Sequence, residues 1–148
     1  MQTLTLRTVY VLVCIAHGRR RIIHINVTRH PTAQWIWRQV VEATPWGTRP
    51  SYVIRDHDRS YGTDFIQSAA RIGITTIVTP IRAPNANAVA ERVIGTLRRE
   101  CLDHLIVLNE RHLLQVLLEY VEHYNRKRPH RSLALDSPHR RPQQLIPK

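Results

Sequence analysis

The chain has 148 residues, of which 43% are hydrophobic, so it can form one domain around a single hydrophobic core. Lys and Arg together number 22 against 11 acidic residues, which gives a net charge of +11 and favours a nucleic acid partner, with a merely solvated arginine-rich surface as the alternative. No apolar run approaches the ~20 residues of a membrane helix, and no signal-peptide pattern opens the chain, so we expect no membrane association and a cytoplasmic protein. The two cysteines, Cys14 and Cys101, are too far apart in sequence to suggest a zinc site or a disulfide framework.

The first third of the chain predicts a β-hairpin followed by a helix. Apolar and β-branched residues indicate strands over 4–15 and 21–28, joined by a short basic turn. After Pro31, apolar residues recur at helical spacing up to Ala43, and the stretch 45–50 ends this helix. Of the tryptophans, Trp35 and Trp46 are expected in the core, whereas Trp37 falls off the apolar face.

The rest of the chain alternates strands and helices. The expected elements are a buried parallel strand at 52–55, a helix at 64–72 closed by Gly73, a strand at 74–79, a helix at about 87–101, and a helix at about 110–126 capped by Asn109. The helix at 87–101 has an apolar stripe of Val89, Val93, Ile94, Leu97 and Cys101, and the last helix has one of Leu113, Leu117, Val121 and Tyr124, widened by Leu114 and Leu118. This alternation predicts an α/β fold, with a core at 1–128 and an extended tail rich in Pro and Arg at 129–148.

Two carboxylates stand where metal chemistry is expected. Asp56 follows a predicted strand, and open α/β sheets place ligand groups at the carboxyl ends of strands. Glu91 lies near the start of the helix at 87–101. Carboxylate oxygens are the ligands that Mg²⁺ prefers, but the spacing of these two residues is a weak signal by itself.

The sequence motifs around these carboxylates are more specific than their spacing. Asp56 opens the pattern Asp-x-Asp-x-x-Tyr-Gly, and the words PNANAVAER…LRREC and YN-x-x-RPH-x-x-L follow in order. Together they resemble the integrase core of insertion-sequence DDE transposases, in the retroviral integrase superfamily, over about residues 9–133. The resemblance implies a ribonuclease H-like mixed sheet with flanking helices, and a bacterial, DNA-associated protein.

The resemblance also implies roles for individual residues. Asp56 matches the second catalytic and metal-binding carboxylate, with Asp58 as the competing choice, and Glu91 matches the third. Asn85 and Asn87 match the loop that positions the active site. Expected DNA contacts are Arg98, Lys127 and Arg128, with Arg92 and Arg99 as general phosphate contacts or plain surface charge. His57 is read as a loop histidine near phosphates, and the arginines at 19–21 as either a solvated hairpin tip or a DNA contact.

One part of the family pattern is absent. Residues 1–41 contain no acid, whereas the family's first catalytic Asp lies on a central strand ahead of the hairpin. We therefore expect that strand to be missing or truncated, which would leave unpaired backbone groups at two strand edges, at about 1–3 kcal/mol each if buried. A two-metal Mg²⁺ or Mn²⁺ site is expected only with the missing Asp restored. We also expect this chain to lack the helix-turn-helix portion common in these transposases.

These expectations leave three hypotheses open. The first is the core of a transposase that joins DNA strands, binds transposon ends and target DNA, and is catalytically incomplete in this copy. The second is a non-catalytic DNA-binding or regulatory subunit that forms a homo-oligomer or joins intact transposase. The third is a decayed reading frame.

Overall fold

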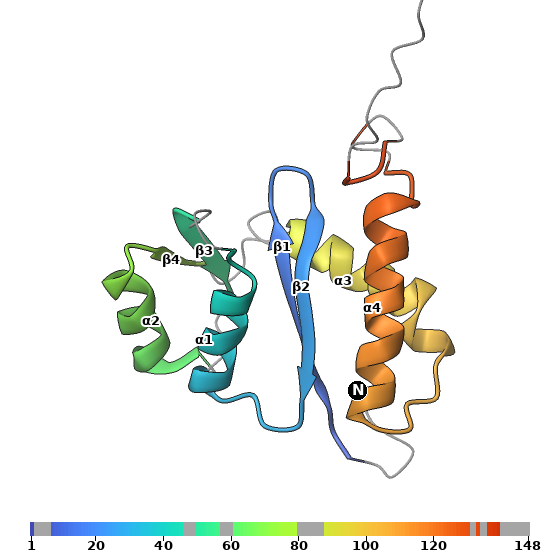
Figure 1. Ribbon diagram of the computed structural model, residues 1–148, viewed down its shortest axis with the longest axis horizontal. Coiled ribbons are helices and arrows are strands. Elements are labelled where there is room, and N and C mark those ends of the chain that lie inside the picture. The colour runs from blue at the N-terminus through green and yellow to red at the C-terminus, as the bar shows by residue number, and fades with distance from the viewer. Residues whose placement is uncertain are drawn as a thin grey trace, which may run out of the picture.

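The computed structural model describes residue 1, residues 7–45, 50–56, 61–79 and 88–130, residue 133 and residues 136–139. Within these ranges four strands and four α-helices alternate in the predicted order (Figure 1). The elements are β1 (Tyr10–Ala16), β2 (Arg21–Thr28), α1 (Ala33–Glu42), β3 (Tyr52–Arg55), α2 (Gly62–Arg71), β4 (Thr75–Val78), α3 (Ala88–Glu100), a short 3₁₀ helix (Leu102–His104) and α4 (Glu110–Arg126). No helix in this described part is long and apolar enough to cross a membrane.

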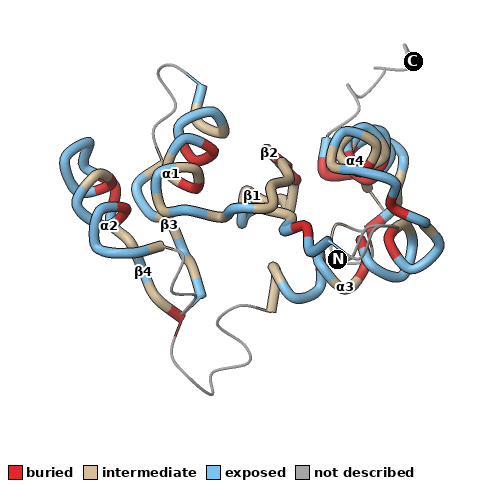
Figure 2. The backbone as a smooth tube through the Cα atoms, turned by 90° about the horizontal axis from the view of Figure 1, so that it is seen from below, coloured by how far each residue is buried: buried red, intermediate tan, exposed pale blue. Residues whose placement is uncertain are grey.

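The larger core lies between the β1–β2 hairpin and the two C-terminal helices. The two strands pair antiparallel, from Tyr10 opposite Thr28 to Ala16 opposite Arg21, with one bulge. The hairpin buries Ile22 and Ile25 against Val93 and Leu97 of α3 and against the apolar stripe of α4, where Leu113 and Leu117 are fully buried. Figure 2 shows α4 and α3 on one side of the hairpin and α1 on the other.

A smaller core joins α1 and α2 to the strands β3 and β4. The two strands are parallel, with Tyr52 opposite Thr75 and Arg55 opposite Val78. The buried residues Ile36, Val40 and Phe65 form the centre of this core. The polypeptide after α2 turns at Gly73, whose φ of 74° is in the left-handed region that glycine adopts without strain, as predicted for a helix C-terminus.

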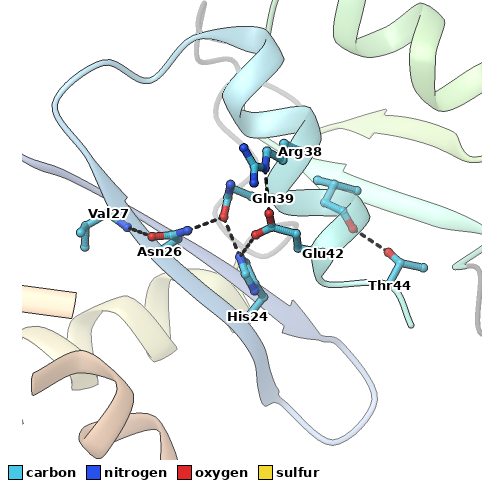
Figure 3. Close-up of polar contacts among 8 residues, drawn as sticks. His24, Asn26, Val27, Arg38, Gln39, Glu42 and Thr44 are labelled. Atoms are coloured by element: carbon cyan, nitrogen blue, oxygen red, sulfur yellow. Dashed lines mark hydrogen bonds and ion pairs between the residues drawn. The ribbon is translucent and has the colours of Figure 1, made fainter. Parts of the chain in front are cut away.

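A polar cluster holds α1 against β2 (Figure 3). The Oε1 atom of Gln39, a residue that is only 2% exposed, lies 2.6 Å from the Asn26 Nδ2 atom that donates to it and 2.8 Å from His24 Nε2. Glu42, one turn further along α1, lies 3.8 Å from the same histidine nitrogen and 2.9 Å from Arg38 Nε. Gln39, which the helical pattern assigned to the core-facing side, therefore contributes hydrogen bonds there.

In the described residues the four strands form two separate two-stranded sheets, not one continuous sheet. The hairpin is one and the β3–β4 pair is the other. The α/β class and the ribonuclease H-like architecture are confirmed.

Three local expectations are wrong. Strand β3 is not buried, because Tyr52 and Ile54 are 63% and 45% exposed along a strand whose one neighbour among the described residues is β4. Trp37 belongs to the smaller core, where its ring packs edge-on against Phe65 at 5.8 Å between centroids, because α2 widens the covered face of α1. Ile94 and Leu118 are exposed, at 44% and 52%, at the borders of their apolar stripes.

The beginning of the predicted tail packs against the core. His130 and Ser137 are both 7% exposed, and Arg19 of the hairpin turn donates from Nη2 to the Asp136 carboxylate at 3.0 Å. These residues of the expected extended tail are therefore packed against the rest of the chain. The boundary between a core at 1–128 and a tail at 129–148 stays a prediction. Trp46 and residues 140–148 lie outside the described residues.

Candidate functional site

Asp56 directly follows β3, at the carboxyl end of a strand in a parallel pair. The sequence places it there because the short apolar run 52–55 ends at two consecutive polar residues. Asp56 is exposed and lines a cavity of about 660 Å³ between β1, β3 and α3. The location at a strand's carboxyl end is the one predicted from the sequence.

Helix α3 borders the same cavity with one face. Ala90, Ile94, Leu97 and Arg98 line it, at the spacing of successive turns of one helix face. Arg98 and Asp56 therefore border one space, although they are 42 positions apart in sequence.

Glu91 lies at the rim of that face and does not line the cavity in this structure. It is exposed, in the first turn of α3, next to the lining residue Ala90. A helix turns by about 100° per residue, so the side chains of Glu91 and Arg98, about two turns apart, leave the helix axis in directions that differ by about 20°. The structure thus brings Asp56 and Arg98 to one cavity and leaves Glu91 at its edge.

Other predicted DNA contacts are distributed differently. Arg92, Arg98, Arg99 and Lys127 are exposed on α3 and at the end of α4. The Arg99 guanidinium lies over Gly95, where a Cβ atom would come within 3.2 Å of it. Asn85, Asn87, His57 and Asp58 lie outside the described residues.

Arg128 is engaged in an intramolecular network at the surface. Its Nη2 and Nε atoms donate to the Glu100 carboxylate at 2.7 Å and 2.9 Å, and its guanidinium lies 5.8 Å from the centre of the Tyr124 ring. The Tyr120 hydroxyl donates to the same carboxylate at 2.8 Å. The hydrogen bonds from Arg128 lower the pKa of Glu100, whereas burial and the bond to Glu100 raise the pKa of Tyr120. The predicted role of Arg128 in DNA binding stays a prediction, and its main contact here is Glu100.

Sequence reasoning missed the structural purpose of the YN-x-x-RPH word. The Asn125 amide is 6% exposed and makes two hydrogen bonds to the backbone of Ile22, accepting from its N–H at 3.0 Å and donating to its C=O at 2.8 Å. The His130 ring packs edge-on against Tyr124 at 4.6 Å, and burial lowers the pKa of His130. This motif attaches α4 to the hairpin through Asn125. It also contacts the LRREC motif of α3, because Arg128 binds Glu100. An asparagine on the apolar stripe of a helix was the signal that pointed to such a contact.

Oxygen donors suited to a hard divalent ion are present at Asp56 and Glu91. The residues that the structure describes, however, include no group of three His, Cys, Asp or Glu side chains close enough to hold a metal ion. The donor chemistry fits Mg²⁺ or Mn²⁺, whereas the number of ligands in the described ranges is too small for a closed site.

A family model described as an integrase core domain matches residues 72–138, which include all of α3 and α4. The match covers the two sequence words that suggested the family. Over residues 72–138 the chain is therefore similar to an integrase core domain. A comparison with curated proteins gives no match.

Solved structures agree with the integrase core domain in fold. A chain of a simian T-cell lymphotropic virus intasome, solved in complex with the PP2A regulatory subunit B56 gamma, superposes with a TM-score of 0.67 at 14% identity, over 93% of this chain and 51% of that one. The catalytic core domain of BIV integrase superposes with a TM-score of 0.56, also at 14% identity, over 86% of this chain and 81% of that one. The protein thus spans about half the length of the intasome chain, and at this identity the likeness shows the shared fold.

Proposed function

We propose that the chain is the core of a DDE transposase of the insertion-sequence type, which binds DNA ends and, when its carboxylate set is complete, transfers DNA strands with the help of Mg²⁺ or Mn²⁺. The observation that carries this proposal is the cavity shared by Asp56 at the end of β3 and Arg98 on α3. The cavity thus has a carboxylate that can bind a metal ion, on Asp56, and a cationic side chain that can bind a phosphate, on Arg98. The net charge of +11 supports DNA as the polyanion.

The chemistry of the side chains suggests a separate role for each residue. Asp56 and Glu91 would hold the divalent ion, which when bound activates an attacking oxygen and stabilises the departing one in phosphoryl transfer. Arg98 would bind a backbone phosphate of the DNA and fix its position beside the two carboxylates. Arg92 and Arg99 on α3 and Lys127 at the end of α4, all of them exposed, would add affinity without sequence preference.

A pair of charge-matched variants tests the DNA-binding part. We expect Arg98→Ala to weaken duplex DNA binding several-fold and to reduce the slope of log K against log salt by about one unit. Arg71→Ala removes the same charge from the exposed end of α2 and should have a smaller effect. Equal effects of the two substitutions would mean that charge alone governs binding and would refute the assigned role of Arg98.

A binding measurement tests the metal part without relying on catalysis. Mn²⁺ titration followed by electron paramagnetic resonance should show weaker binding by Asp56→Asn than by the parent chain. The matched variant Asp64→Asn changes an exposed carboxylate at the start of α2 and should bind as the parent does. Identical titrations for Asp56→Asn and the parent would remove Asp56 from the metal site.

A second candidate is a non-catalytic DNA-binding subunit that joins an intact transposase. Its support is the net charge of +11, which favours a polyanionic partner whether or not a metal is bound. Steeply salt-dependent DNA binding together with no measurable Mn²⁺ binding would favour this candidate over the first.

A further inference from the structure

Arg55, the last residue of β3, lies on the strand face that packs against the smaller core. Successive residues of a strand point to opposite faces, so Arg55 shares a face with Val53. Val53 packs against the buried residues of the smaller core, whereas Ile54 on the other face is 45% exposed. Arg55 is half-buried. A charged side chain on a core-facing position contributes little to hydrophobic packing, so its polar contacts decide its role.

The guanidinium of Arg55 is held on the aromatic ring at the start of α2. Its Cζ atom lies 4.9 Å from the centre of the Tyr61 ring, a distance at which the ring face attracts a cation. The Tyr61 ring packs edge-on against Phe65 at 5.2 Å between centroids, and Phe65 is only 1% exposed. The smaller core therefore fixes the surface on which the guanidinium lies.

The same guanidinium contacts the backbone of Asp56. Its Nη1 atom donates to the Asp56 C=O at 3.1 Å. On the other side of the Asp56 Cα atom, the Arg55 C=O accepts from the Thr79 N–H at 2.9 Å, directly after the last pair of the β3–β4 ladder. Both peptide groups that flank Asp56 are thus held by hydrogen bonds, one from the residue that follows β4 and one from the Arg55 side chain.

Two held peptide groups fix the direction in which the Asp56 side chain leaves the backbone. A peptide group is planar, so each residue has only two soft backbone torsions, one toward each flanking peptide group. With both groups held, φ and ψ of Asp56 are set, and with them the direction of its Cα–Cβ bond. A carboxylate that is oriented in advance binds a metal ion more tightly, because less freedom is lost on binding.

From these contacts we infer that Arg55 is a positioning residue for Asp56: its guanidinium, held on the Tyr61 ring, fixes the Asp56 peptide group and with it the direction of the side chain that carries the carboxylate. The functional consequence rests on the proposed metal-binding role of Asp56, whereas the positioning itself can be tested without metal. Charge alone predicts the opposite effect on metal binding. A guanidinium beside a metal site repels the metal ion, so its removal would strengthen binding.

Carbonyl-carbon relaxation, measured by NMR on the metal-free full chain, tests the positioning. The variant is Arg55→Met, which keeps a long apolar side chain but removes the guanidinium. We expect the order parameter of the Asp56 C=O to fall from about 0.85, typical of a rigid backbone, to below about 0.6. The C=O of residue 55, which Thr79 holds, should stay rigid. An unchanged Asp56 C=O, or an equal fall at both carbonyls, would overturn the inference, since an equal fall reports a general loosening of the strand end.

Two substitutions at Tyr61 test whether its ring holds the guanidinium. Tyr61→Phe keeps the ring face under Arg55, whereas Tyr61→Leu removes it, and both variants lack the hydroxyl. We expect the order parameter of the Asp56 C=O to be clearly lower in Tyr61→Leu than in Tyr61→Phe. The double variant of Tyr61→Leu and Arg55→Met should lose no more than Arg55→Met alone, because the two side chains act as one unit. Equal order parameters in the two Tyr61 variants, or additive losses in the double variant, would contradict this arrangement.

Mn²⁺ titration followed by electron paramagnetic resonance tests the consequence for the proposed function. Groups that orient a metal ligand typically contribute tenfold or more to affinity, so Arg55→Met should bind Mn²⁺ about tenfold more weakly than the parent chain. The matched variant Arg71→Met removes the same charge from the exposed end of α2 and should bind as the parent does. Unchanged or stronger binding by Arg55→Met would overturn the positioning role. A parent chain that binds no Mn²⁺ would refute the proposed function instead, and the relaxation measurement would still decide whether Arg55 positions Asp56.

Discussion

Replacement of Asn125 by Ala tests how α4 is attached to the hairpin. The Asn125 amide accepts from the Ile22 N–H and donates to the Ile22 C=O, and both residues are buried, at 6% and 2% exposure. Ile22 is next to the bulge of β2, where the amide substitutes for a neighbouring strand. The substitution leaves two buried backbone groups without partners, at about 1–3 kcal/mol each. We therefore expect the free energy of unfolding to fall by about 3 kcal/mol.

Urea denaturation followed by circular dichroism measures this change. A loss of about 3 kcal/mol is a large part of the 5–15 kcal/mol typical of a whole domain, and lowers the melting temperature by roughly 10 °C. The control is Asn109→Ala at the other end of the same helix, where the exposed side chain accepts from the His112 N–H and about 1 kcal/mol is expected. If Asn125→Ala costs no more than the control, the amide does not have the role described above.

A pH series on Asn125→Asp separates the two hydrogen bonds. A carboxylate can accept from the Ile22 N–H but cannot donate to its C=O, so burial and this repulsion should raise the pKa of the new Asp in the folded state. The protonated acid can donate again. The loss of stability relative to the parent should therefore be full above the folded-state pKa and should shrink as the pH falls below it. A loss that does not vary with pH would contradict this explanation.

Three further predictions concern the core and its titrating groups. Arg128 lowers the pKa of Glu100, so Glu100→Gln should lower the free energy of unfolding by about 0.5–1 kcal/mol at pH 7. This loss should disappear as the pH falls through the lowered pKa. A loss that stays constant from pH 7 to pH 3 in urea titrations would disprove the ionic contribution. Burial raises the pKa of Cys14 to about 11 from an ordinary value of 9.0. In a Cys101→Ser background, the Cys14 thiol should therefore react with a disulfide reagent at pH 8 about 100-fold more slowly in the native state than in the unfolded state. Equal rates in the two states would show that the thiol is not shielded. Leu117 is fully buried, and Leu117→Ala should lower the free energy of unfolding by about 2–5 kcal/mol; a loss below 1 kcal/mol would place it outside the core.

Local sequence signals determined the elements themselves. β2, β3 and α4 have the predicted bounds, because hydrophobic periodicity and the capping residue Asn109 act within a few residues along the chain. The location of Asp56 at a strand end and of Glu91 in the first turn of a helix followed from the same local signals. The integrase words pointed to the family before any contact was known.

Only the tertiary structure decided which elements meet. It places Trp37 against Phe65, ties Asn125 to the backbone of Ile22, and pairs Arg128 with Glu100, because these contacts depend on how helices and strands pack at long sequence distance. The same holds for the cavity shared by Asp56 and Arg98. A strand's pattern of side chains records which faces are covered, but it contains no signal for an edge that has no neighbour, since every residue carries the same backbone donor and acceptor.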